Sequence, residues 1–216
     1  SFVNGIYYTL FNNNMSAMVT GGNYVRYSGD VIIPSKITYD GNTYTVTGIG
    51  SNAFSKSIGL ASVTIPSSVT TINGGAFDGC TSLSSIKVDS DNKYFDSREN
   101  CNAIIEKATN TLILGCKNSS IPNSITAIGA AAFSGISSLT SVNIPENVTI
   151  IGNYAFKGCT SLTSVNIPNS VISIGEEAFF GCTSLSSITI SNSETYIGTY
   201  AFGGCTSLTS VKLPEV

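Results

Sequence analysis

The 216-residue sequence predicts a repeat solenoid that is mostly β-strand, with irregular or short helical turns on its convex side. Three observations lead to this prediction: the dipeptide Ala-Phe recurs, its phenylalanines keep a fixed spacing, and most copies contain a polar-apolar alternation that ends at a proline. One such unit cannot bury its apolar edge alone, whereas stacked units bury a continuous core.

The repeat period is 23 residues. Successive phenylalanines of the Ala-Phe pairs are separated by 23, 56, 23, 23 and 23 residues, and the longer gap is one period plus 33 inserted residues. Two more apolar columns keep this spacing, so about six coils are expected. The columns are Leu60, Leu83, Leu139, Leu162, Leu185 and Leu208, and Val63, Ile86, Val142, Val165, Ile188 and Val211.

One segment of each coil is predicted to form a strand. Residues 164–168, Ser-Val-Asn-Ile-Pro, alternate polar and apolar side chains as a half-buried strand does. Proline then ends the strand, because it has no N–H for the next coil. Strands of adjacent coils should pair in parallel about 4.8 Å apart, so six coils predict one long sheet of roughly 25–30 Å.

Residues 1–45 are predicted to form a β cap on the first coil. Segments 6–10 and 15–19 have strand-like composition, and asparagines 12–14 favour a turn between them. Segment 30–37 repeats part of the coil pattern and should form a half-coil, which a tight turn at Asp40-Gly41 follows. Six of the ten tyrosines lie in this region and either fill the cap or form an exposed platform.

The inserted residues 89–121 contain nine of the 23 charged residues. Segments 103–105 and 112–114 are apolar and flank 107–110, which predicts a hairpin with Ile105 opposite Leu112. This register would place Cys101 opposite Cys116, where they form either a disulfide bridge or a packed thiol pair. The insertion either extends a coil or forms a specific binding feature.

Composition excludes several function classes. Only 11% of residues are charged and the net charge is −3, which does not suit binding to nucleic acid. Histidine and tryptophan are absent, so the commonest general base and a common metal ligand are missing. No apolar run approaches the roughly 20 residues that cross a bilayer, and no signal-peptide pattern is visible.

The remaining candidate constellations do not predict chemistry. Cys80, Cys159, Cys182 and Cys205 share one repeat column with Ser57 and Ile136, so we expect buried, free thiols there. The segment beginning at Asp89 starts like a calcium loop but has lysine and tyrosine at positions five and six. Adjacent Glu176 and Glu177 are expected to be solvated. The prediction is therefore no enzyme, no metal and no cofactor.

The repeat resembles a known family. The pattern Ile-Gly-x-x-Ala-Phe-x-Gly-Cys-x-Ser-Leu-x-Ser-Val-x-Ile-Pro-x-Ser-Val is similar to the BspA-like, or Treponema-type, leucine-rich repeats, and it covers residues 46–214 apart from the insertion. The resemblance implies a right-handed leucine-rich-repeat solenoid. It also implies a bacterial protein that is secreted or on the cell surface, with an adhesin-like role toward host or bacterial proteins.

A single domain spanning 1–216 is expected, with the cap and half-coil at 1–45, repeats 1–2 at 46–88, the insertion at 89–121 and repeats 3–6 at 122–216. The last coil ends without a polar cap, so either the chain continues or that coil pairs with a neighbouring molecule.

The predicted function is a non-catalytic protein–protein interaction module. Its partner would be an extracellular or surface protein such as a host matrix protein, with a glycan or a structural spacer role as alternatives. Binding is expected through outward strand positions and two residues of the insertion. These are Lys87, Ser141, Asn143, Ser164, Asn166, Ser187, Thr189, Ser210 and Lys212, with Tyr94 and Arg98. Such short polar side chains would act through many weak contacts, strengthened by avidity.

Overall fold

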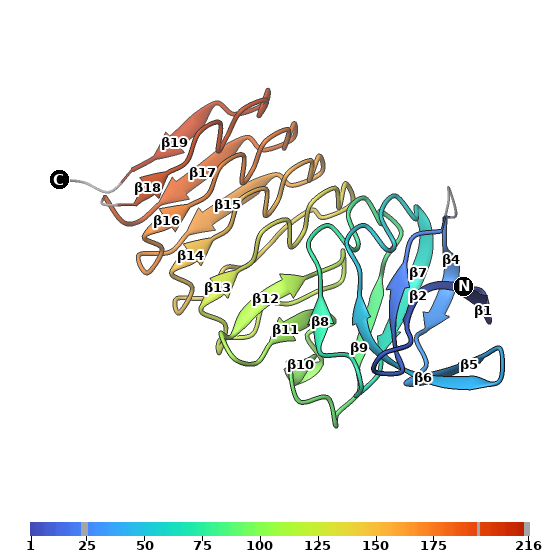
Figure 1. Ribbon diagram of the computed structural model, residues 1–216. Helices are drawn as coiled ribbons and strands as arrows, with labels where there is room; N and C mark the ends of the chain where they lie inside the picture. Colours follow the sequence, from blue (N-terminus) through green and yellow to red (C-terminus); the bar gives the residue numbers. More distant parts are fainter. Residues whose placement is uncertain (23–25, 194, 214–216) are drawn as a thin grey trace. The chain divides into compact units, whose positions relative to one another are not determined.

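The computed structural model describes residues 1–22, 26–193 and 195–213. The chain divides into two compact units, Ser1–Asp96 and Ser97–Val216, and each is described by itself. Both consist of short strands joined by tight turns (Figure 1), and the one helical element in the described residues is the 3-10 turn η1 (Arg98–Asn100). The predicted strand-rich repeat fold is confirmed, with turns that are irregular. The organisation as one domain stays a prediction.

The first unit begins with a mixed sheet that forms the predicted cap. Strands β2 and β3 form a hairpin around the asparagine turn, and β5 and β6 form another around Asp40 and Gly41, whose φ angles are 49° and 74°. Both predicted turns are therefore confirmed. The order is β1 (Phe2–Val3), β2 (Ile6–Phe11), β3 (Ser16–Thr20), β6 (Asn42–Ile49) and β5 (Lys36–Tyr39), and β8 (Thr71–Ile72) also pairs with β6.

A second sheet in the first unit contains the half-coil. Its strands are parallel and follow the order β4 (Ser28–Ile32), β7 (Gly59–Ile65) and β9 (Ser85–Val88). Val31 pairs with Val63, so the half-coil continues the apolar column of the repeats, as predicted. A short strand, β10 (Phe95–Asp96), ends the unit.

Tyr27 closes the aromatic stack of the first unit. Its ring centroid lies 4.7 Å from that of Phe54, which in turn stacks on Phe77 at 4.9 Å. The Tyr27 hydroxyl donates to the Thr20 carbonyl at 2.8 Å, and the Tyr27 N–H donates to Ser57 Oγ at 3.0 Å. Ser57 therefore bonds to the cap at a position where four of the other five coils have cysteine.

The second unit is a stack of coils with two sheets, one parallel and one mixed. The longer strands are β15 (Ser164–Ile167), β17 (Ser187–Ile190) and β19 (Ser210–Lys212). A second sheet, which the sequence analysis did not predict, runs from the hairpin β11 (Ile104–Glu106) and β12 (Thr111–Leu114) through β13 (Ala127–Ile128), β14 (Ile150–Ile151), β16 (Ser173–Ile174) and β18 (Tyr196–Ile197).

The predicted single sheet of six longer strands is wrong. In the described residues, five of these strands form: β7 and β9 join the half-coil strand β4 in a sheet of the first unit, and β15, β17 and β19 form a sheet of the second. Residues 141–144 of the third coil have the strand-like sequence but form no strand. The preceding insertion contributes β12 to the other sheet only, so this segment has no strand beside it on that side.

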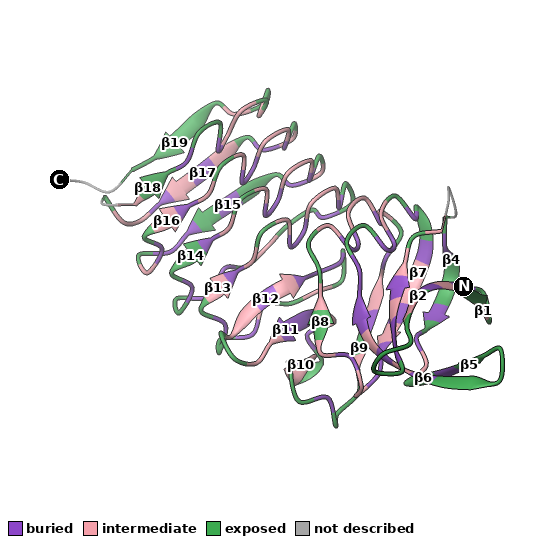
Figure 2. Cartoon of the chain, in the orientation of Figure 1, coloured by how far each residue is buried: buried purple, intermediate pink, exposed green. Residues whose placement is uncertain are grey.

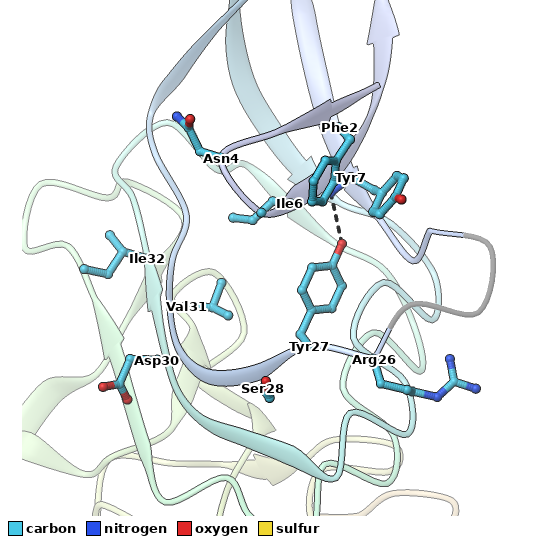
Figure 3. A pocket seen from close by; sticks show the side chains of 11 residues that line it. Phe2, Asn4, Ile6, Tyr7, Arg26, Tyr27, Ser28, Asp30, Val31 and Ile32 are labelled. Carbon is cyan, nitrogen blue, oxygen red and sulfur yellow. Dashed lines mark hydrogen bonds between the residues drawn. The ribbon is translucent and has the colours of Figure 1, made fainter.

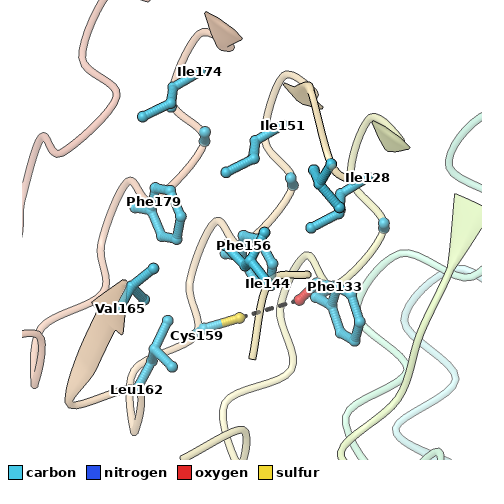
Figure 4. Packing of buried hydrophobic residues seen from close by; sticks show 14 of the residues in the cluster. Ile128, Phe133, Ile144, Ile151, Phe156, Cys159, Leu162, Val165, Ile174 and Phe179 are labelled. Atoms are coloured by element: carbon cyan, nitrogen blue, oxygen red, sulfur yellow. Dashed lines mark hydrogen bonds between the residues drawn. The ribbon is translucent and has the colours of Figure 1, made fainter. Parts of the chain in front are cut away.

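Stacked phenylalanines form the core of the second unit (Figure 4). Ring centroids are 5.1 Å apart for Phe133 and Phe156, 5.0 Å for Phe156 and Phe179, and 5.4 Å for Phe179 and Phe202. These distances are close to the strand spacing of about 4.8 Å, because each coil contributes one ring at the same place. The alternation predicted for the strands is also present, since Val165 and Ile167 are buried while Ser164 and Asn166 are exposed.

Two positions in every coil have left-handed backbone conformation. The first precedes the Ala-Phe pair, and the second lies two residues after the phenylalanine, where glycine adopts the positive φ without a steric penalty. The first column is Asn52, Gly75, Ala131, Tyr154, Glu177 and Tyr200, and the second is Lys56, Gly79, Gly135, Gly158, Gly181 and Gly204.

The insertion adds an irregular coil to the second unit. Ile105 pairs with Leu112 as predicted, and β12 pairs in parallel with β13. A register shift between Ile104 and Ile105 then moves Ile104 opposite Leu114. The insertion is thus part of the stack, which is one of the two alternatives left open by the sequence.

The register shift corrects the predicted opposition of Cys101 and Cys116. Continuing the shifted register brings Asn102 opposite Cys116, and Asn102 Nδ2 donates to Cys116 Sγ at 3.3 Å. Cys116 Sγ also contacts the Asn102 carbonyl oxygen at 3.6 Å. Both cysteines are buried free thiols, so the hypothesis of a bridge between them is not met.

Candidate binding surfaces

The second unit places part of the predicted site on one strand face. Parallel pairing aligns Ser164 with Ser187 and Ser210, and Asn166 with Thr189 and Lys212. These six residues therefore lie in two ladders, and Figure 2 shows β19 as exposed and β15 as alternately exposed and buried. The surface offers hydroxyl and amide groups and one ammonium group. These groups suit hydrogen bonding to a partner that covers several coils.

The other predicted site residues are not in these ladders. Ser141 and Asn143 are exposed but lie outside any strand. Lys87 lies on β9 of the first unit beside Thr64, and Tyr94 is 51% exposed in the same unit. Arg98 of the second unit is half-buried, and its Nη1 donates to Asn110 Oδ1 at 2.9 Å, so it supports the hairpin.

Asn92 shows why the calcium-like segment has a structural role. This fully buried side chain donates from Nδ2 to the carbonyl oxygens of Pro66 and Val69, each at 2.9 Å. Its Oδ1 accepts from the N–H groups of Tyr94 and Phe95, each at 2.9 Å. Asn92 thus joins two turns of the first unit. In the described residues no group of three or more acidic, cysteine or histidine side chains could hold a metal ion.

A cluster of aromatic and charged side chains on the turns of the second unit was not predicted from the sequence. This turn cluster consists of Tyr154, Lys157, Glu177 and Phe180. Lys157 Nζ lies 2.6 Å from Glu177 Oε2, and it is 5.2 Å from the Tyr154 ring centroid and 5.3 Å from that of Phe180. The hydrogen bond to the Glu177 carboxylate raises the pKa of Lys157 above its usual value.

Aromatic rings beside an ammonium group are common anchors in protein interfaces. The turn cluster therefore supplies the aromatic anchors that the strand face lacks. Its signal in the sequence was the variable residue on each side of Ala-Phe, since those positions differ between coils while the buried columns repeat.

The cap contains a pocket of about 360 Å³, which is within the size range of ligand sites. Figure 3 shows Phe2, Ile6 and Tyr7 on one side and residues of β4 on the other. The rings of Phe2 and Tyr7 are 4.5 Å apart, and the Tyr7 N–H donates to the Tyr27 hydroxyl at 3.1 Å. One wall of the pocket therefore carries apolar side chains and is tied to Tyr27 by a hydrogen bond, and β4 forms the opposite wall.

Most described tyrosines of the cap fill it. Tyr8, Tyr27 and Tyr44 are 2%, 5% and 4% exposed, while Tyr39 is 43% exposed. Tyr24 lies outside the described residues. Burial of these rings favours the filled cap over an exposed platform.

The repeated thiols are structural. Each donates to the carbonyl oxygen of the phenylalanine one coil earlier, at 3.1 Å for Cys80 and Phe54 and at 3.2 Å for Cys182 and Phe156. Burial raises the pKa of Cys80 and of Cys182 to about 12, so the nucleophilic thiolate is disfavoured. The prediction of buried free thiols is confirmed for Cys80, Cys159 and Cys182, whereas Cys205 is half-buried.

Parallel strands stacked at one coil spacing, with a leucine at the same place in each coil that is buried in all but the last, define a leucine-rich-repeat protein. A model of the BspA type leucine rich repeat region, described with 6 copies, matches residues 33–106 and 103–216. The chain belongs to this family, as its resemblance predicted. Leucine-rich repeats are in general a non-enzymatic fold that binds other proteins, and the chain is an interaction module of that kind.

Two solved structures are similar in fold. A leucine-rich repeat protein from Eubacterium ventriosum ATCC 27560 is 24% identical with a TM-score of 0.64, and the match covers 86% of this chain and 54% of that chain. The pneumococcal vaccine antigen PcpA is 18% identical with a TM-score of 0.65, covering 99% and 81% respectively. The chain thus spans about half of the first protein. No curated protein matches the sequence.

In residues 1–22, 26–193 and 195–213 no helix is long and apolar enough to cross a membrane.

Proposed function

We propose that this chain is a non-catalytic, adhesin-like module of a secreted or cell-surface bacterial protein, and that it binds an extracellular protein. The observation that carries the proposal is the six-copy match to the BspA type repeat over residues 33–216. The names of the similar proteins support a surface location, since one is a pneumococcal vaccine antigen.

The proposed contact surface of the second unit is its strand face together with Ser141 and Asn143. Because this face has short polar side chains, each contact contributes little and affinity depends on covering several coils. The turn cluster offers stronger anchors, namely the rings of Tyr154 and Phe180 beside Lys157. In the first unit, Lys87 and Tyr94 remain the proposed contacts.

Two alternatives predict different binding. A glycan-binding module needs exposed rings for sugar stacking, and the burial of Tyr8, Tyr27 and Tyr44 counts against the cap as such a platform. A structural spacer would bind neither proteins nor glycans. An enzyme would need an activated acid–base pair, whereas the Glu177 carboxylate is engaged by Lys157.

The test is binding of the purified chain to immobilised extracellular-matrix proteins and, in parallel, to a glycan array. Saturable protein binding that Lys212→Glu weakens several-fold, with Lys117→Glu as an exposed control outside the strand face, would support the proposal. Binding to glycans alone would favour the first alternative. The absence of both would leave the spacer role.

A further inference from the structure

The pocket in the cap lies along the free edge of a strand. Four of its lining residues, Ser28, Asp30, Val31 and Ile32, belong to β4. This strand pairs with β7 on one side, and no described strand pairs with its other side. The first unit therefore combines an open sheet edge and a cavity lined by both polar and apolar side chains in one place (Figure 3).

Backbone geometry shows which groups of β4 point to the open side. The Ile33 N–H donates to the Thr64 carbonyl oxygen at 3.1 Å, so Ile33 faces β7. Backbone polar groups alternate between the two sides of a strand in a parallel sheet, so those of Val31 also face β7. The N–H and C=O groups of Asp30 and Ile32 then point to the open edge. An extended peptide can form main-chain hydrogen bonds with these N–H and C=O groups.

Side chains around the edge define the residues that fit. The pocket is floored by Ile6, Tyr27 and Val31, which are 4%, 5% and 8% exposed, so an apolar side chain suits it. The two neighbouring peptide residues would lie on the outer face of the sheet, next to Asp30 and Ile32. There Ile32 is 71% exposed and favours an apolar neighbour, while the exposed Asp30 carboxylate favours a basic one.

We propose that the open edge of β4 binds an extended peptide segment of a partner protein by adding it as a further strand. The segment carries a basic residue beside Asp30, an apolar residue in the pocket and an apolar residue beside Ile32. This site lies in the first unit and goes beyond the strand-face function proposed above. Either proposal can therefore fail without the other.

The experiment is an NMR titration of the ¹⁵N-labelled full chain with three acetylated, amidated peptides. The probes are Ser-Lys-Val-Ile-Thr, the reversed order Thr-Ile-Val-Lys-Ser, and Ser-Glu-Val-Ile-Thr. We expect one of the two lysine peptides to shift the amide signals of Asp30 and Ile32 and to slow their hydrogen exchange. Whether the first or the reversed order binds shows whether the added strand is parallel or antiparallel. The glutamate peptide should bind more weakly.

Two variants separate strand addition from a general apolar contact. Ile32→Pro removes the N–H that faces the open edge and leaves the Ile33 bond to β7, so binding should weaken about tenfold or more. Ile32→Thr keeps that N–H and should change binding less than about threefold on the same reasoning. Asp30→Lys should reverse the preference between lysine and glutamate peptides, and this remains a test if the proline variant does not fold.

Three results would overturn the proposal. In the first, none of the peptides shifts the amides of Asp30 and Ile32. In the second, the proline and threonine variants bind equally well, or Asp30→Lys leaves the charge preference unchanged. In the third, both amides are already protected from exchange in the free chain, because another segment would then occupy the edge.

Discussion

Removing one ring from the middle of the phenylalanine stack tests how the second unit is stabilised. Phe156 is fully buried and lies 5.1 Å from Phe133 and 5.0 Å from Phe179. Burial of the ring contributes about 2 kcal/mol, and two stacking contacts add about 1 kcal/mol each. Phe156→Ala should therefore lower the free energy of unfolding by about 4 kcal/mol, within the range for buried phenylalanines.

Phe202 provides the matched control. It occupies the same column, is only half-buried and stacks on Phe179 at 5.4 Å. With half the burial and one stacking contact, Phe202→Ala should lower the free energy of unfolding by about 2 kcal/mol. Urea denaturation followed by far-UV circular dichroism measures both losses. Equal losses, or a loss below about 1.5 kcal/mol for Phe156→Ala, would refute the reasoning that ring stacking and burial add in this way.

Four further predictions concern polar groups and thiols. Asn92→Ala should destabilise the chain by about 3 kcal/mol in chemical denaturation, because buried backbone groups lose their partners; a loss under about 1 kcal/mol would contradict this role. Lys157→Met should cost at most about 0.5 kcal/mol in low salt and nothing measurable in high salt, since the ion pair with Glu177 is partly exposed to solvent. The pair strengthens stability only below the raised pKa of Lys157, so its effect should vanish at strongly alkaline pH. Burial raises the pKa of the Cys182 thiol from 9.0 to about 12 in the folded chain. The free energy of unfolding should therefore fall as pH rises above 9.0, because the thiol then ionises in the unfolded chain but not in the folded one. In denaturant without reductant, six thiols should react with Ellman's reagent, whereas four would show that two of the six cysteines form a disulfide.

The sequence predicted the features that repeat. The columns of phenylalanine, leucine and cysteine, the hairpin turn at Asp40 and Gly41, and the pairing of Ile105 with Leu112 all follow from local pattern and turn chemistry. These predictions succeeded because side-chain periodicity and turn geometry depend on residues close in the chain.

Other features depended on contacts between coils. The segment at 141–144 has a strand pattern but forms no strand, and the preceding coil offers no strand beside it. A one-residue register shift brought Asn102 rather than Cys101 opposite Cys116. Neither result is visible in the local sequence, since strand pairing is a property of two segments.

The sequence by itself determined the coil length, the buried columns and the polar outer positions of the strands. The tertiary structure decided which outer positions share one surface, and it assembled the turn cluster from two coils and the pocket from β1, β2 and β4. The physical reason is that burial repeats with the period of the sequence, whereas a binding surface depends on which segments become neighbours in space.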